Sequence, residues 1–204
     1  MIIKRIPAGV YAANCYILID EITKECAVID PGGDGEDLIN YINDMNAKVR
    51  YVLLTHGHAD HTGAVGELTE KYNVPAYIHA ADKKFIDDGE FMFGPLKYKG
   101  ISVELNPEIK EGKVFSLGDI QISCIETPGH TLGGVCFLVE NNLFTGDTLF
   151  LRSIGRTDLR GGSFETLMDS IKNKLLMLDD SIIVYPGHGP QTSIKYERGN
   201  NPFI

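Results

Sequence analysis

The chain has 204 residues, enough for one large domain or two small ones, and its 43% apolar and 23% charged residues are typical of a globular protein. The formal net charge of −9 argues against binding to nucleic acid or to an anionic membrane through a basic surface. No apolar run approaches the ~20 residues of a membrane-spanning helix, and the chain starts with a strand-like segment rather than a signal peptide. We therefore expect one domain over residues 1–204, located in the cytoplasm.

The first half of the chain alternates short apolar runs with amphipathic segments. Strands are predicted at residues 2–6, 15–19, 26–30, 49–54 and 74–79. Helices are predicted from Asp34 or Asp37 to about Met45, over 62–68 and over 80–86. The aromatic segment 89–95 is predicted to pack on the core, with a lid over a site as the alternative.

The second half is mostly β. Hairpins are predicted over 113–125 and 135–145, followed by a helix over 164–178 with Ser163 as its N-cap, a strand over 181–185 and a final helix over 194–198. The four cysteines lack CxxC spacing, and each lies in an apolar strand-like segment. We therefore expect buried, reduced thiols.

A cluster of histidines directly follows the strand predicted at 49–54. In an extended segment, side chains two residues apart point the same way, so His56 and His58 can share one metal ion. Asp60 and His61 fall where the chain must turn, so they can aim at a second ion beside the first. Neutral imidazoles and carboxylates suit zinc, iron or manganese.

Three more residues that can bind metal share one sequence context. His130, Asp147 and His188 each lie just past an apolar strand and directly behind a glycine. Strand ends at one sheet edge converge in space, so we expect these side chains to meet the histidine cluster. His79 is the one histidine outside this pattern, and we interpret it as structural or as a surface residue.

The expected geometry sorts the ligands into two neighbouring sites. One ion would be held by His56, His58 and His130, and the other by Asp60, His61 and His188. Asp147 would bridge both ions through its two carboxylate oxygens. Structural zinc sites are usually closed and rich in cysteine, so this set favours a catalytic centre.

These residues resemble the signature of the metallo-β-lactamase superfamily: His56-Gly57-His58-Ala59-Asp60-His61, then His130, Asp147 and His188. The resemblance implies an α/β (α+β) fold, a four-layer αββα sandwich with the metals at one edge. It also implies that Asp30 is a buried aspartate behind the ligands. Asp30 and Thr55 are our candidates for fixing the orientation of the imidazoles.

Finer motifs resemble the glyoxalase II-like hydrolases and the related persulfide dioxygenases: Gly146–Phe150, Ile154–Asp158 and Tyr185–Pro190. The resemblance implies a hydroxyacylglutathione hydrolase-like thioesterase, acting on a small-molecule thioester. Two divalent ions, expected to be zinc, would lower the pKa of a bridging water toward ~7, and Asp60 would orient the resulting hydroxide besides ligating. Full-length glyoxalase II enzymes carry a further helical domain after these motifs, so the identity of the thiol stays open.

Other interpretations remain open. A persulfide dioxygenase would hold one iron with His56, His130 and Asp147. A lactonase, a phosphoesterase or a metal-binding module without activity are further alternatives. The loaded metal, the acyl group and the oligomeric state are not fixed by the sequence.

Several basic and aromatic residues are candidates for contacting the substrate. Arg156 either holds a substrate carboxylate near the metals or pairs with Asp158 to fix its loop. Lys195, Tyr196 and Arg198 either contact a thiol carrier or form the solvated face of the last helix.

Overall fold

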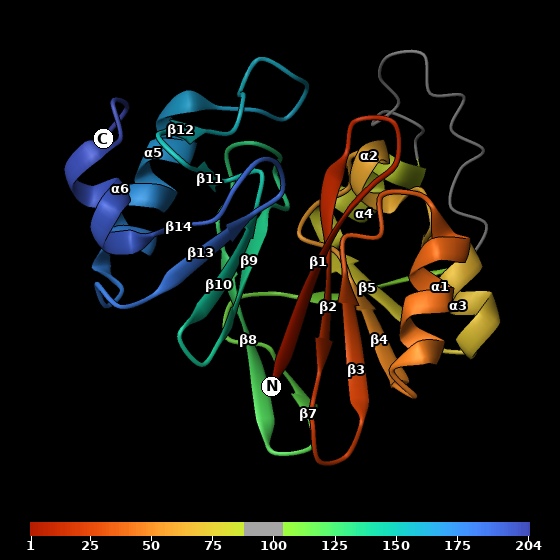
Figure 1. Cartoon of the computed structure of the whole chain (residues 1–204). Coiled ribbons are helices and arrows are strands. Elements are labelled where there is room, and N and C mark those ends of the chain that lie inside the picture. The colour runs from red at the N-terminus through yellow and green to blue at the C-terminus, as the bar shows by residue number, and fades with distance from the viewer. Residues whose placement is uncertain (88–103) are drawn as a thin grey trace.

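The computed structural model describes residues 1–87 and 104–204, so the aromatic segment predicted at 89–95 lies outside the described residues. The described chain forms two six-stranded sheets that face each other (Figure 1). The first sheet has the order β1-β2-β3-β4-β5-β6: β1 (Ile2–Ala8), β2 (Ala13–Ile19), β3 (Glu25–Ile29), β4 (Lys48–Leu53), β5 (Ala76–His79) and β6 (Leu105–Ile109). The strands pair antiparallel from β1 to β3 and parallel from β3 to β6.

The second sheet has the order β14-β13-β10-β9-β8-β7: β7 (Val114–Leu117), β8 (Ile120–Glu126), β9 (Val135–Val139), β10 (Asn142–Gly146), β13 (Ile183–Pro186) and β14 (Thr192–Ser193). Its strands are antiparallel except for the parallel pair β10–β13. A separate small hairpin joins β11 (Leu149–Phe150) to β12 (Ser153–Ile154).

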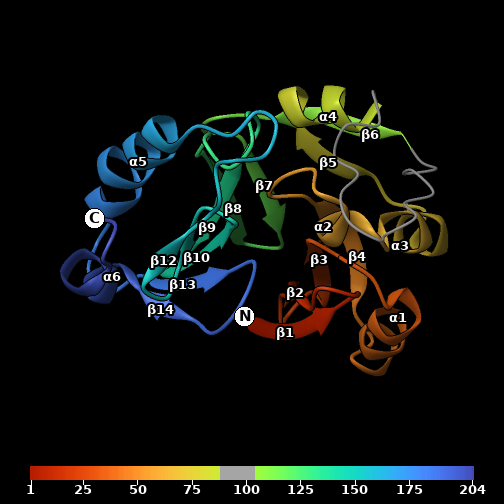
Figure 2. The ribbon, with the colours of Figure 1, turned by 90° about the horizontal axis from the view of Figure 1, so that it is seen from above.

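Helices cover the outer face of each sheet (Figure 2). The first sheet carries α1 (Gly35–Asp44) and α3 (Val65–Tyr72), with α2 (Ala59–Thr62) and α4 (Ala80–Asp87) nearby. The second sheet carries α5 (Phe164–Asn173), the 3₁₀ helix η1 (Leu175–Met177) and α6 (Ile194–Asn200). The predicted four-layer αββα sandwich is therefore confirmed.

Strand β2 shows how the sequence builds these layers. Cys15, Ile17 and Ile19 pack into the apolar cluster under α1 and α3, whereas Tyr16 and Leu18 pack into the cluster between the two sheets. Side chains alternate across a strand, so a strand buried on both faces must be apolar throughout. A third apolar cluster fills the space between the second sheet and the helices α5 and α6.

Most predicted elements are present, with differences at helix ends. The helix predicted at 62–68 is two helices, because α2 already begins at Ala59 and ends before α3 starts. The helix predicted at 164–178 is α only to Asn173 and then tightens into η1. Ser163 caps α5 as predicted, by accepting from the Thr166 N–H, whereas the Asp34 carboxylate accepts from Gly9 instead of capping α1.

Two further expectations can be compared with the structure. The four cysteines are free and buried, as predicted. In the described part of the chain, no helix combines the length and apolar character needed to cross a bilayer.

Candidate metal centre

Parallel strand pairing brings the candidate ligands to one edge of the sandwich. In the first sheet β3 and β4 run side by side, with Ile29 opposite Leu53, so Asp30 lies beside the start of the histidine cluster. In the second sheet Gly146 is opposite Pro186, so the residues that follow, Asp147 and His188, come out at the same edge. The structure therefore brings together side chains that are far apart in sequence, as the strand-end pattern predicts.

The first ion group, defined as His56, His58 and His130, is a cluster of three buried imidazoles. One ring nitrogen from each lies within 4.8 Å of the others. The closest pair is His58 Nδ1 and His130 Nε2, 2.9 Å apart. His130 Nδ1 lies 2.7 Å from the Arg156 carbonyl oxygen, which can only accept, so this nitrogen carries the proton and Nε2 offers a lone pair.

The second ion group, defined as Asp60, His61 and His188, lies beside the first and also has its ligand atoms within 4.8 Å of one another. His188 Nε2 is 3.3 Å from Asp60 Oδ2, and His61 Nε2 is 3.9 Å from the same oxygen. His61 is fully buried, whereas the side chain of His188 is 33% exposed. The second group therefore opens toward solvent at His188.

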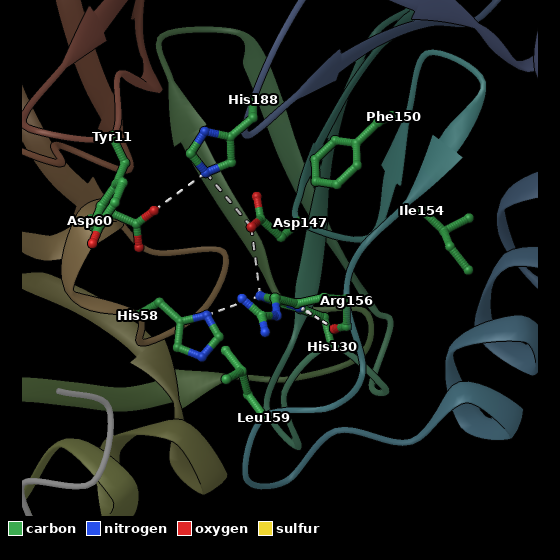
Figure 3. A pocket seen from close by; sticks show the side chains of 10 residues that line it. All are labelled: Tyr11, His58, Asp60, His130, Asp147, Phe150, Ile154, Arg156, Leu159 and His188. Carbon is green, nitrogen blue, oxygen red and sulfur yellow. Dashed lines mark hydrogen bonds and ion pairs between the residues drawn. The ribbon is translucent and has the colours of Figure 1, made fainter. Parts of the chain in front are cut away.

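Asp147 lies between the two groups (Figure 3). Its Oδ1 is 3.4 Å from His61 Nε2 in the second group, and its Oδ2 is 3.6 Å from His130 Nε2 in the first. Oδ2 also lies 3.7 Å from His188 Nε2. This placement is the one that a carboxylate shared by two cations requires, and the sharing itself stays a prediction.

Asp30 and Thr55 orient the imidazoles from behind. Asp30 accepts from the Thr55 N–H (2.8 Å) and from the Thr55 hydroxyl (2.6 Å), and its Oδ2 is 3.0 Å from His61 Nδ1. Because the Thr55 hydroxyl gives its proton to Asp30, its oxygen accepts from His56 Nδ1, 3.0 Å away. Both rings therefore turn Nε2 toward the centre, as is usual for metal-binding histidines.

The donor atoms fit a divalent cation. Among the described residues, four buried side-chain atoms lack a hydrogen-bond partner: His56 Nε2, His61 Nε2, Asp60 Oδ1 and Asp147 Oδ1. Leaving buried polar atoms unpaired costs about 1–3 kcal/mol each, so their concentration in one place calls for a ligand. Nitrogen and carboxylate oxygen donors without cysteine suit zinc, iron or manganese in an exchangeable site.

The protonation states differ between the groups. Burial lowers the pKa of His56 well below its ordinary value, and lowers the pKa of His58 to about 3. Burial would also lower the pKa of His61, but Asp147 and Asp30 outweigh it and raise that pKa well above the ordinary value. Burial opposes ionisation of Asp147, yet the nearby His61 keeps the pKa of this carboxyl below its ordinary value. His56 and His58 of the first group are therefore neutral at pH 7, the form that binds metal.

Asn14 fastens the loop that carries His188, and the sequence analysis missed it. Its backbone N–H donates to the Gly187 carbonyl (2.7 Å), and its side-chain amide donates to the carbonyls of Pro186 and Gly189 (2.9 Å each). The available signal was a buried polar residue at the start of an otherwise apolar strand. Asp82 was missed as well, since it reads as an ordinary polar residue on a short amphipathic helix.

A cavity of about 500 Å³ opens onto the ligands. The rest of its lining is largely apolar, formed by Tyr11, Phe150, Ile154 and Leu159 (Figure 3). Arg156 also lines it, and its guanidinium makes two 2.7 Å hydrogen bonds to Asp158, the pairing that one of our two interpretations predicts.

The candidates on the last helix lie elsewhere. Lys195, Tyr196 and Arg198 belong to α6, and the described residues that line the cavity do not include them. Arg198 pairs with Asp180 and donates to the Leu178 carbonyl, which ties α6 to the chain before β13. His79, which we left outside the metal centre, lies 3.3 Å from Glu126.

The fold and the clustered ligands define a metal-binding sandwich of the lactamase type. Residues 8–188 match the Metallo-beta-lactamase superfamily, and the chain belongs to this family, which confirms the resemblance drawn from its motifs.

Relatives of known name cover nearly the whole chain. It is 37% identical to hydroxyacylglutathione hydrolase GloC of Haemophilus influenzae over 100% of this chain and 98% of that protein. It is 38% identical to the probable metallo-hydrolase YqgX of Bacillus subtilis, over 98% and 96% of the two chains.

Solved structures are similar over the same extent. The BLEG-1 B3 metallo-beta-lactamase is 37% identical with a TM-score of 0.88, covering 99% of each chain. TTHA1623 in a di-iron-bound form is 32% identical with a TM-score of 0.87, covering 98% of this chain and 100% of that one. ETHE1 from Myxococcus xanthus is 29% identical with a TM-score of 0.83, covering 99% and 84%.

Proposed function

We propose that this member of the metallo-hydrolase family is a thioesterase of the hydroxyacylglutathione hydrolase type. The observation that carries the proposal is the pair of ion groups around Asp147 at the base of an open, largely apolar cavity. The likeness to GloC over almost its whole length supports a thioester as the substrate class. We further propose that the enzyme acts in the cytoplasm on a small molecule, and not on nucleic acid or a membrane.

The proposed cofactor is a pair of divalent ions, zinc first, with iron or manganese as alternatives. The first ion group and the second ion group would each hold one ion, and Asp147 would contact both. When bound, such ions lower the pKa of a coordinated water to about 7 and polarise a carbonyl oxygen.

The chain's own residues prepare this chemistry. Asp60 lines the cavity, so besides ligating it can orient the attacking hydroxide. Asp30 and Thr55 hold the His61 and His56 rings so that the Nε2 atoms face the reaction centre. A departing thiol has a reference pKa near 8.5, so it leaves as thiolate without a strong acid.

The cavity also suggests how a substrate lies. Phe150, Ile154 and Leu159 offer an apolar surface for an acyl group, and Arg156 lies on the same wall. We propose that Arg156 exchanges Asp158 for a substrate carboxylate, because an exposed ion pair contributes only about 0–1 kcal/mol and is readily rearranged. A thiol carrier would extend from the cavity mouth, and contacts with Lys195, Tyr196 or Arg198 on α6 remain a prediction.

Elemental analysis of the purified protein, coupled to a panel of thioesters, tests the proposal. We expect two ions per chain and turnover of at least one hydroxyacyl thioester, lost after chelation and restored by zinc. Two bound ions without hydrolysis of any thioester would contradict the proposed substrate class, and turnover of lactones alone would indicate a lactonase.

A persulfide dioxygenase is the alternative oxidoreductase. His56 and His130 belong to one ion group, and Asp147 Oδ2 lies 3.6 Å from His130 Nε2, so one iron could be held by these two histidines and the carboxylate. The equally assembled second ion group favours the two-ion hydrolase, because His61 Nε2 and Asp60 Oδ1 are buried there without partners. One iron per chain with oxygen uptake on adding a persulfide would overturn the thioesterase proposal.

A further inference from the structure

Asp82 is a fully buried carboxylate behind the first ion group, and its hydrogen bonds go to residues beside the ligands in sequence. It belongs to the first turn of α4. Its Oδ2 accepts from the Gly57 N–H (3.0 Å) and from the Thr131 hydroxyl (2.8 Å), and its Oδ1 accepts from the Gly133 N–H (2.6 Å). Burial raises the pKa of this carboxyl, and the three hydrogen bonds offset part of the cost of burying it.

Each of the three donors belongs to a loop that carries candidate ligands. Gly57 stands between His56 and His58, in the loop that leaves the first sheet after β4. Thr131 and Gly133 follow His130, in the loop that leaves the second sheet after β8. One carboxylate therefore joins two ligand loops that come from different sheets.

The close contact between Asp82 and residue 133 requires a glycine at position 133. A Cβ built on Gly133 would lie 2.6 Å from Asp82 Oδ1 and 2.9 Å from the Asp82 backbone nitrogen, too close for any side chain. The loop after β8 can therefore bring the Gly133 N–H within hydrogen-bond distance of Asp82.

We propose that Asp82 is a positioning residue, which sets the separation of His58 and His130 and thereby the affinity of the first ion group for its cation. It would act through Gly57, Thr131 and Gly133, without touching an ion or a substrate. The inference rests on the proposed metal centre and is independent of the thioester substrate. It also predicts selectivity, because none of the three hydrogen bonds is made by α2, which carries Asp60 and His61, or by the loop of His188.

Only a carboxylate can accept all three hydrogen bonds. Asparagine has the same shape, but its NH₂ group would face the Gly57 N–H or the Gly133 N–H, donor against donor. Asp82→Asn should therefore push one loop away while leaving α4 and the core packed.

The test is a zinc titration of the metal-stripped full-length chain, with imidazole NMR signals reporting which histidines bind. We expect Asp82→Asn to weaken zinc binding at His58 and His130 about 10- to 100-fold, the usual effect of losing a group behind a ligand, and to leave binding at His188 within about threefold of wild type. Glu197→Gln is the matched control, because Glu197 is also fully buried and accepts from a backbone N–H, a hydroxyl and an amide. That variant should lose stability without losing zinc at the first group.

A second pair of variants keeps Asp82 in place. Thr131→Val removes one of the three donors and should weaken zinc binding at His58 and His130 by a smaller factor than Asp82→Asn does. Thr131→Ser keeps the hydroxyl and should bind zinc at these histidines like wild type. If Asp82→Asn does not fold, this pair decides the question. Wild-type zinc binding at His58 and His130 in both Asp82→Asn and Thr131→Val, or equal losses at both ion groups, would overturn the role of Asp82. A wild-type chain that binds no ion at all would instead overturn the proposed metal centre.

Discussion

The two ion groups lie side by side but are built differently. The first consists of three imidazoles that are each no more than 3% exposed, and burial keeps His56 and His58 neutral. The second contains a carboxylate, a histidine flanked by Asp30 and Asp147, and the partly exposed His188. The first group is thus the more deeply buried one, whereas the second group carries charge and is partly exposed at His188, and side chains of both groups line the cavity where a substrate would arrive.

The largest expected effect comes from the residue that the groups share. Asp147→Ala should lose both ions and lower thioester turnover by at least about 10³-fold, because the centre loses its common ligand and several kcal/mol of charge stabilisation. Ion content and turnover measure this, and circular dichroism should show a retained fold. Asp119→Ala, in the exposed β7–β8 turn, serves as the control. Retention of two ions by Asp147→Ala would show that the groups are independent.

His188→Ala should separate the two groups. The second ion should be lost while His56, His58 and His130 keep the first, so ion content falls from two to one and turnover falls about 10²-fold or more. Imidazole NMR of the zinc-loaded variant should still show His58 and His130 bound. Loss of both ions from this variant would mean that the first ion group cannot hold a cation alone.

Low pH should destabilise the metal-free protein through the buried, neutral His58 of the first ion group. In the metal-free protein the pKa of His58 is about 3 when folded and 6.5 when unfolded, so between these values the unfolded chain binds the extra proton. The stabilisation from His58 is present above pH 6.5 and is lost as the pH falls toward 3. His58→Gln should therefore show a smaller drop in Tm between pH 6.5 and 4 than wild type, measured by thermal melting. An unchanged drop in Tm in His58→Gln would contradict the account.

Asn14 should affect cation binding by the second ion group alone. Asn14→Ala removes two hydrogen bonds to the loop around His188, which should lower the free energy of unfolding by about 1–3 kcal/mol and weaken the second ion severalfold. Denaturant unfolding and zinc titration measure the two effects. Asn142→Ala, which removes an amide hydrogen bond to Val139 in a distant hairpin, should leave both ions in place. Weaker zinc binding at the first ion group in Asn14→Ala would contradict the claim that Asn14 supports only the second ion group.

The smallest effect is expected at the cavity wall. Arg156→Gln should raise the KM for thioesters that carry a carboxylate by about tenfold, the usual worth of one hydrogen bond to a charged group, and leave neutral thioesters unchanged. Asp158→Asn should lower the KM for the carboxylate-bearing substrates or leave it unchanged. Equal KM values in wild type and Arg156→Gln would restrict Arg156 to fixing its loop.

The ligands were predictable because their signal is local. Each of His130, Asp147 and His188 stands behind a glycine at a strand end, and strands that run in the same direction bring their ends to a common edge. Asp82 and Asn14 gave no comparable signal, since their roles depend on backbone groups from distant segments. The hairpin β11–β12 has strands of two residues each, too short for a periodic pattern, so the wall that it contributes at Phe150 and Ile154 could not be foreseen.

The central claim is that distant side chains cage two cations around Asp147. Anomalous scattering at the zinc edge, from crystals of the zinc-loaded protein, tests it most directly. The account predicts two peaks, one among His56, His58 and His130, the other among Asp60, His61 and His188, with Asp147 between them. A single peak, or peaks away from these residues, would contradict it.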